Sequence, residues 1–233
     1  MAIDAELRGL EPVDLMAAEA ARIEEQVAAL TAADWLRPSR CEGWTVRDVV
    51  AHLAASETYH RACLDGEVGA LFEEMAANGV TSVAEFNAVG ISGFDGVADD
   101  EVLRQFAADD GDTRRRFRER GDGDVDTSVG LYPARWQAFH LAGELATHAD
   151  DMFVTVPAED AADRRDWRAR FSRFALHEAK PDLVLDVDPG RTRVRGDGID
   201  VELGDDDLVA AVAGRGESRR LPPDVCSALS TMP

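Results

Sequence analysis

The sequence of 233 residues is poor in cysteine and poorer in lysine, with Lys180 as its one example. Cys41, Cys63 and Cys226 are too few and too scattered for a disulfide framework, and an odd number leaves one thiol unpaired. Reduced thiols are typical of the cytoplasm, where we expect the protein to be. The first residues, MAIDAELRGL, have no cationic start followed by an apolar block, so we expect no signal peptide. No run approaches the roughly 18 apolar residues of a membrane helix, so we expect no membrane partner.

Positive charge is also scarce, because 46 acidic residues stand against 25 basic ones and the formal net charge is −21. Nucleic acids and anionic membrane surfaces need clustered positive charge, so neither is expected as a partner. Most of the carboxylates are expected to coat solvated faces. The strong preference for arginine over lysine, with many Ala, Val and Asp residues, is typical of GC-rich bacteria such as actinobacteria.

Several familiar catalytic motifs are absent. The sequence contains no G-x-x-x-x-G-K-[ST] phosphate loop, no Gly-rich dinucleotide loop, no H-E-x-x-H zinc motif and no nucleophile elbow around a serine. The placement of the five histidines therefore carries most of the remaining information about function.

Apolar residues recur at helical spacing over most of the chain. Met16, Ala20, Ile23 and Val27 follow this period within residues 13–30, and polar residues occupy the opposite face. This pattern predicts an amphipathic helix that buries one face.

A second helix is predicted over residues 45–64. Thr45 can cap it, because the Asp48 carboxylate three residues later can bond back to the start of the helix. Further helices are predicted over residues 99–120, 133–153 and 158–177, with short helical pieces inside 71–96 and a polar Gly/Asp-rich loop over 121–130.

The period of the sequence changes after Pro181. Leu183, Leu185 and Val187 are spaced by two, and residues 192–195 and 199–203 alternate in the same way. A short helix over 206–212 follows, ending at Gly214. The predicted fold is mostly α: a helical bundle over residues 1–178, then a small α+β domain, a β-meander plus one helix, over residues 179–233.

Three residues of metal-binding type, His140, Glu144 and His148, stand at four-residue steps. Such residues lie on one face of a helix, about 6 Å apart along its axis per step. Glu144 and His148 can converge on one cation, and His52, among apolar residues of the second predicted helix, is the natural third ligand. Two histidines and one glutamate leave an open coordination position, as at catalytic zinc sites.

The spacing alone leaves a plainer interpretation open. A Glu–His pair four residues apart is usually a surface ion pair, and a histidine among apolar residues is usually a satisfied core residue. His140 lies roughly 12 Å along the axis from His148, so we expect it near the site but not on the same ion. We interpret His60, eight residues after His52, as an ordinary residue off the metal-binding face.

Two segments carry a family resemblance. Residues 30–53, LTAADWLRPSRCEGWTVRDVVAHL, resemble the start of the mycothiol-dependent maleylpyruvate isomerase family, which belongs to the DinB/YfiT-like superfamily of metal-binding four-helix bundles. The segment ELATHADD, residues 144–151, matches the family's Glu, His and following acid. The C-terminal meander and the helix that ends in AVAGR resemble a shortened version of the family's C-terminal domain.

The resemblance implies that His52, Glu144 and His148 bind one divalent metal ion, with zinc the preferred metal. It also implies mycothiol, an actinobacterial thiol, as cosubstrate, in line with the arginine-rich composition. A free thiol has a pKa of about 8.5, and coordination to zinc deprotonates it. A metal-bound thiolate is then expected to add to an electrophilic small molecule, in an isomerase or in an S-transferase.

A carboxylate-bearing substrate needs a cationic partner, and arginine offers a two-pronged one. Arg215, at the end of AVAGR, is the first candidate for contact with substrate or cofactor. Asp151, three residues after His148, is expected to orient a metal ligand or the substrate. Cys41 is interpreted as a packing residue, because the reactive thiol is expected from the cosubstrate.

Two alternatives to a thiol-dependent enzyme remain at this point. One is a metalloenzyme of the same fold that acts in secondary metabolism without a thiol. The other is a non-catalytic regulatory bundle in which the metal only stiffens the fold. The complete set of two histidines and one glutamate favours an enzyme over the regulatory bundle.

Overall fold

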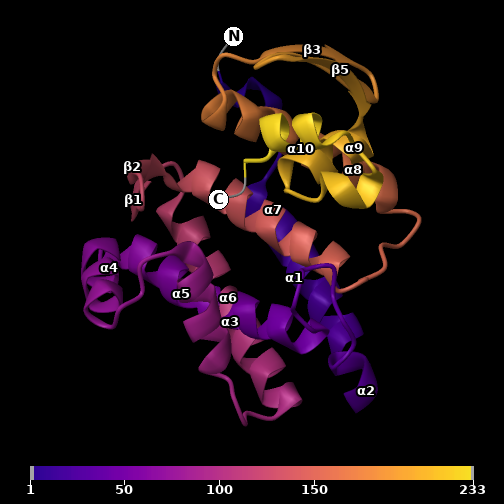
Figure 1. Ribbon diagram of the computed structural model, residues 1–233. Coiled ribbons are helices and arrows are strands. Elements are labelled where there is room, and N and C mark those ends of the chain that lie inside the picture. The colour runs from indigo at the N-terminus through magenta and orange to yellow at the C-terminus, as the bar shows by residue number, and fades with distance from the viewer. Residues whose placement is uncertain (1–2, 232–233) are drawn as a thin grey trace. The chain divides into compact units, whose positions relative to one another are not determined.

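The computed structural model describes residues 3–231 (Figure 1). Packing divides the chain into a bundle unit, Glu11–Thr155, and a second unit formed by the described residues on either side, 3–10 and 156–231. The boundary predicted after residue 178 falls inside the second unit, and the division into separately folding domains there stays a prediction. Within the described residues, no helix has the length and apolar character needed to cross a membrane.

The bundle unit is built mainly from helices (Figure 1). In chain order it holds α1 (Pro12–Ala28), α2 (Ala32–Trp35), α3 (Val46–Asp65), α4 (Val68–Ala77), α5 (Val83–Ser92), α6 (Asp99–Arg120), strands β1 (Asp124–Thr127) and β2 (Gly130–Pro133), and α7 (Ala134–Asp151). The helices α1, α3, α6 and α7 pack against one another as a four-helix bundle, with α3 alongside α6 and α1 alongside α7.

The buried face of α1 follows the sequence pattern. Met16, Ala20, Ile23 and Val27 are each no more than 1% exposed. Complete burial of a large apolar side chain contributes about 1.5–3 kcal/mol, so this stripe holds α1 against the rest of the bundle. The predicted amphipathic helix is confirmed.

Helix α3 begins at the predicted capping box. The Thr45 amide donates to Asp48 Oδ2 at 2.8 Å, and the Asp48 amide donates to Thr45 Oγ1 at 3.2 Å. The helix ends at Gly66, whose φ of 74° lies in the left-handed region that glycine adopts without strain. Both ends of the helix that carries His52 are thus fixed by local sequence.

Helix α5 crosses α3 at a close approach that requires glycine. A Cβ atom on Gly90 would lie 2.7 Å from the Ala55 Cβ atom, which is too close for any side chain. Among its residues none is fully buried, so α5 is held mainly by this contact with α3. The two short helices α4 and α5 resolve the predicted helical pieces inside residues 71–96.

The prediction of a loop over residues 121–130 is wrong, because β1 and β2 form an antiparallel hairpin there. The strands are four residues long, and only Val125 and Thr127 of β1 are buried. Strands so short show no alternating apolar pattern, and the hairpin depends on packing against α3 and α7. A turn closed by Thr127, which donates to the Gly130 carbonyl at 2.8 Å, joins the strands.

The second unit combines a three-stranded antiparallel sheet with helices. It holds the 3₁₀ helices η1 (Ile3–Leu7) and η2 (Gly216–Arg219), α8 (Ala161–Ala179), β3 (Val184–Asp188), β4 (Arg191–Gly196), β5 (Ile199–Gly204), α9 (Asp205–Val212) and α10 (Pro223–Leu229). The strand order β3-β4-β5 is the predicted meander. Its core includes Leu176, Val194, Leu208 and Leu229, all fully buried. A mostly α fold with helices first and a small α+β part last is confirmed, although α10 was not predicted.

Candidate metal site

The structure brings together the three predicted metal ligands inside the bundle unit. His52 projects from α3 and Glu144 and His148 from α7, and their donor atoms lie within 4.8 Å of one another. His52 Nε2 is 3.4 Å from Glu144 Oε1, and the two histidine rings are 4.9 Å apart between centroids. Both histidine side chains are buried, whereas the Glu144 side chain is 28% exposed. The cluster therefore opens to solvent on the Glu144 side.

Asp151 contacts one of these candidate ligands. Its Oδ2 atom lies 3.1 Å from His148 Nδ1, and the residue is 1% exposed. A carboxylate on one ring nitrogen fixes the ring and leaves the other nitrogen, Nε2, to bind a metal. The expected ligand-orienting role is thus supported by the geometry.

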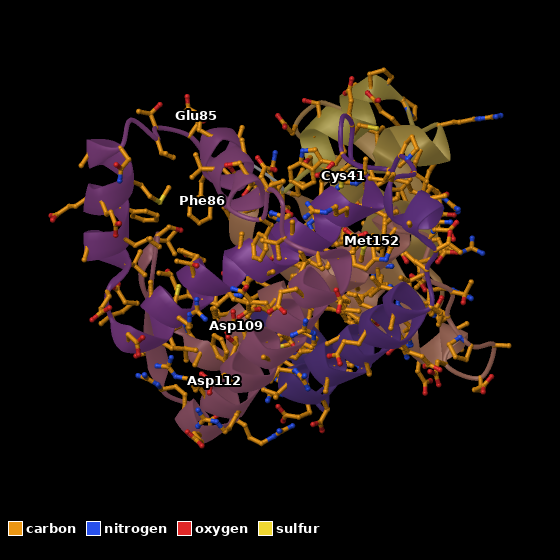
Figure 2. All side chains as sticks on the ribbon, turned by 90° about the horizontal axis from the view of Figure 1, so that it is seen from below. Cys41, Glu85, Phe86, Asp109, Asp112 and Met152 are labelled. Carbon is orange, nitrogen blue, oxygen red and sulfur yellow. The ribbon has the colours of Figure 1, made fainter. Side chains whose placement is uncertain are left out.

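The segment before α3 closes over the end of α7. The Arg40 amide donates to the Asp151 carbonyl at 3.0 Å, and Arg37 donates to the Met152 carbonyl at 2.8 Å. Cys41 and Met152 accordingly lie near each other in Figure 2. At the start of α3, the Trp44 ring packs 5.1 Å from the His52 ring, centroid to centroid. These contacts bring together, at one site, the two sequence segments that carry the family resemblance.

Cys41 does more than the predicted packing. Its Sγ atom donates to Asp151 Oδ2 at 3.1 Å and lies 3.9 Å from His148 Nδ1. Cys41, His148 and Asp151 thus form a second set of possible metal donors within the described residues. Because Nδ1 of His148 faces this set, an ion there and an ion between His52 and Glu144 would use opposite nitrogens of the ring.

The site strongly favours one positive charge between its carboxylates. Burial would raise the pKa of Glu144, but the hydrogen bond from His52 and the charges of His60, His52 and His148 outweigh it and lower the pKa to about 2. Burial would lower the pKa of His148, but hydrogen bonds with Asp151 and Cys41 and the charge of Glu144 raise it to about 9. A proton on His148 or a metal cation satisfies the same electrostatic demand, so the donor set fits a divalent ion.

His60 supplies no atom to either donor set of the described residues, but it lies beside a candidate ligand. His60 is 7% exposed, and its Nε2 atom lies 3.8 Å from Glu144 Oε2, the oxygen that does not face His52. Eight residues along an α-helix rotate the side-chain direction by about 80° around the helix axis. His52 and His60 therefore both lie on the side of α3 that meets α7. The eight-residue spacing was therefore a usable signal for a residue near the metal ligands.

His140 lies near the site, as expected. It is two turns before His148 on α7, and its Nε2 atom is 3.2 Å from the Tyr132 hydroxyl. Neither donor set found in the described residues includes it. Its contact with β2 ties the hairpin to the ligand-bearing helix.

Arg215 lies in the second unit, directly after Gly214 at the end of α9. Its side chain is half-buried. Arg219, by contrast, pairs with Asp207 at 2.8 Å on the surface. The three candidate metal ligands belong to the bundle unit, and the role of Arg215 toward a substrate stays a prediction.

A buried acid on α6 accompanies the site. Asp110 is 1% exposed, its Oδ2 atom accepts a hydrogen bond from Arg114 at 2.6 Å, and its Oδ1 atom has no hydrogen-bond partner among the described residues. Burial raises the pKa of this carboxyl to about 6; Arg114 opposes the rise and the charge of Glu57 adds to it. The ionised form of Asp110 is therefore a cost to the folded protein at neutral pH.

Asp110→Asn is expected to stabilise the protein at neutral pH. The pKa of Asp110 is about 6 in the folded protein and about 4 in the unfolded chain, so the folded protein holds this proton to a higher pH. The wild type thus loses stability as pH rises through this window, by about 3 kcal/mol at most, and the variant does not. Urea unfolding at about pH 4 and about pH 7 should give an advantage to the variant that appears only at the higher pH.

Asp109→Asn is the control for this effect. Asp109, labelled in Figure 2, precedes Asp110 on α6 but pairs with Arg61 at 2.9 Å and is partly exposed. Its replacement removes the same charge without relieving a buried carboxylate, so no stabilisation is expected. An equal gain in both variants would contradict the explanation by burial.

The mycothiol maleylpyruvate isomerase N-terminal domain family matches this chain over residues 16–153. The chain belongs to this family. The matched range holds most of the four-helix bundle and includes His52, Glu144 and His148. No curated relative matches the chain.

Two solved structures have a similar fold. A crystal structure of the mycothiol-dependent maleylpyruvate isomerase has a TM-score of 0.64 and 17% sequence identity, over 92% of this chain and 94% of that one. A mutant of that isomerase gives a TM-score of 0.62 at 17% identity, over 89% of this chain and 90% of the other. Because 90% and 94% of the two solved chains are matched, the expected shortening of the C-terminal part is not seen against these structures.

Proposed function

We propose that this protein is an isomerase that uses a divalent metal, most simply zinc, and a low-molecular-weight thiol, mycothiol, to convert a small electrophilic molecule from its cis to its trans form. The observation that carries the proposal is the convergence of His52, Glu144 and His148 within 4.8 Å inside the segment that matches the family. The mycothiol-dependent maleylpyruvate isomerase with a similar fold supports the same reaction class. The reduced thiols that this chemistry needs favour the cytoplasm.

The metal would be held by His52, Glu144 and His148, and when bound it would supply Lewis acidity that favours the thiolate form of the cosubstrate. The chain's own residues prepare the site. Asp151 fixes the ring of His148, and Trp44 packs against the ring of His52. The partial exposure of Glu144 leaves room for a small molecule to approach.

The proposed reaction is balanced without any other reactant. The thiolate sulfur adds to one carbon of the cis double bond, and the electron pair of that bond passes to the other carbon and its conjugated carbonyl. The resulting single bond rotates, and return of the electron pair expels the same thiolate and restores the double bond in the trans form. If the intermediate instead takes up a proton, such as the one that the thiol lost, a thioether remains and the protein is an S-transferase. Arg215 is our candidate for binding a carboxylate of the substrate or the thiol, because a guanidinium can hold a carboxylate through two hydrogen bonds.

The test combines metal analysis with a panel of thiols. Purified protein should contain zinc in about stoichiometric amount, and it should isomerise maleylpyruvate with added mycothiol but not without a thiol. Chromatography of the product distinguishes a released trans isomer from a stable thioether, and Arg215→Ala should raise KM for a carboxylate substrate. Turnover that needs no thiol would instead favour a thiol-independent metalloenzyme of the same fold. Bound metal without any turnover would favour a regulatory bundle.

A further inference from the structure

A network of buried polar side chains, Thr113, Glu57 and His60, lies behind the candidate metal site and reaches Glu144, so that it joins three helices of the bundle unit. Thr113 of α6 donates to Glu57 Oε2 at 2.5 Å. Glu57 Oε1 lies 3.5 Å from His60 Nδ1, and His60 Nε2 lies 3.8 Å from Glu144 Oε2. Glu144 Oε1 faces His52. Glu144 therefore directs one carboxylate oxygen, Oε1, toward the metal site and the other, Oε2, toward this network.

The three residues of the network are too deeply buried to act as solvated surface groups. Thr113 is fully buried, and Glu57 and His60 are 3% and 7% exposed. Buried ionisable groups are costly unless they are paired, so their retention in the core calls for a specific partner. His60 Nδ1 has no hydrogen-bond partner among the described residues, and Glu57 Oε1 lies 3.5 Å from it. The two contacts of His60, 3.5 Å to Glu57 and 3.8 Å to Glu144, are longer than hydrogen bonds and are close polar contacts.

The geometry of this network suits the task of holding a metal ligand. His60 lies between two carboxylates, with Nδ1 toward Glu57 and Nε2 toward Glu144. An N–H of the imidazole ring can donate to the outer oxygen of Glu144, while Glu57 fixes the ring from its other side.

We propose that His60, supported by Glu57 and Thr113, is a positioning residue that holds the outer oxygen of Glu144 and so directs the inner oxygen toward His52 and His148. This inference rests on the proposed metal site. It assigns a role to residues that supply no ligand themselves. Residues that orient ligands in this way typically affect metal affinity by about 10–100-fold.

The test measures metal affinity directly, with a competing chelator, in variants of His60. His60→Leu is expected to lower the affinity for Zn²⁺ by about 10–100-fold. His60→Gln keeps an N–H donor that can reach Glu144 and is expected to restore most of that loss. Glu57→Gln should weaken the affinity for Zn²⁺ as well. It should cause little further loss when combined with His60→Leu, because both changes interrupt the same network of side chains.

A spectroscopic readout and a matched control separate positioning from general loss of packing. In Co²⁺-loaded protein, His60→Leu should change the visible d–d bands, whereas Cys63→Ala should not. Cys63 is also buried on α3, three residues after His60, and belongs to neither donor set. An unchanged affinity in His60→Leu, or an equal loss in Cys63→Ala, overturns the inference while leaving the metal site intact. Absence of Zn²⁺ binding by the wild type would instead overturn the metal site itself.

Discussion

His148→Ala is expected to reduce the affinity for Zn²⁺ on the order of 100-fold or more, because it removes a ligand and not merely a residue that orients one. The change also leaves the Asp151 carboxylate, which is 1% exposed, without the imidazole that partners it. Thiol-dependent turnover should be lost together with the metal. Elemental analysis and a chelator competition titration measure the first effect, and the isomerisation assay measures the second.

His140→Ala is the matched control for this prediction. His140 lies on the same helix, two turns before His148, and contacts Tyr132. It belongs to neither donor set of the described residues, so its replacement should leave the affinity unchanged. Wild-type affinity in His148→Ala, or an equal loss in both variants, would contradict the assignment of the ligands.

Leu208→Ala is expected to lower the free energy of unfolding by about 2–5 kcal/mol. Leu208 is fully buried in the core of the second unit, where its cluster includes Leu176, Val194 and Leu229. The loss is large beside the total stability of a typical protein, about 5–15 kcal/mol. Because the three metal ligands belong to the bundle unit, the folded variant should bind Zn²⁺ as the wild type does.

Urea unfolding followed by circular dichroism gives the stability, and Val187→Ala serves as its control. Val187 lies on β3 of the same unit but is 46% exposed, so its truncation should change stability by less than about 0.5 kcal/mol. A loss of Zn²⁺ affinity in folded Leu208→Ala would contradict the assignment of the site to the bundle unit alone.

The convergence of the three candidate ligands was predictable because helical spacing is a local property. Glu144 and His148 are one turn apart on α7, and His52 stands in a segment of α3 that is apolar on most sides. Residue type then narrowed the chemistry, since histidine and glutamate are the donors that zinc accepts. The family resemblance linked the two segments, and in the folded bundle their donor atoms lie within 4.8 Å of one another.

The residues that support the ligands were harder to predict, because their partners are distant in sequence. Thr113 meets Glu57 across 56 positions, and Cys41 meets Asp151 across 110. Spacing within one helix says which face a residue occupies, but not which side chain of another helix reaches it. For His60, helical spacing gives the angle from His52 and so the side of α3, but its contact with the Glu144 carboxylate depends on how α7 packs there.

The sequence by itself determined the long helices, the capping box of α3, the late change to strands and the residue types of the candidate metal site, because these depend on periodicity and on contacts within about four residues. The tertiary structure decided what those elements do together. It formed a hairpin from a polar stretch, placed Asp151 within hydrogen-bond distance of His148, and brought His60 behind Glu144. Burial and pairing across helices set these roles, and both exist only after the chain has packed.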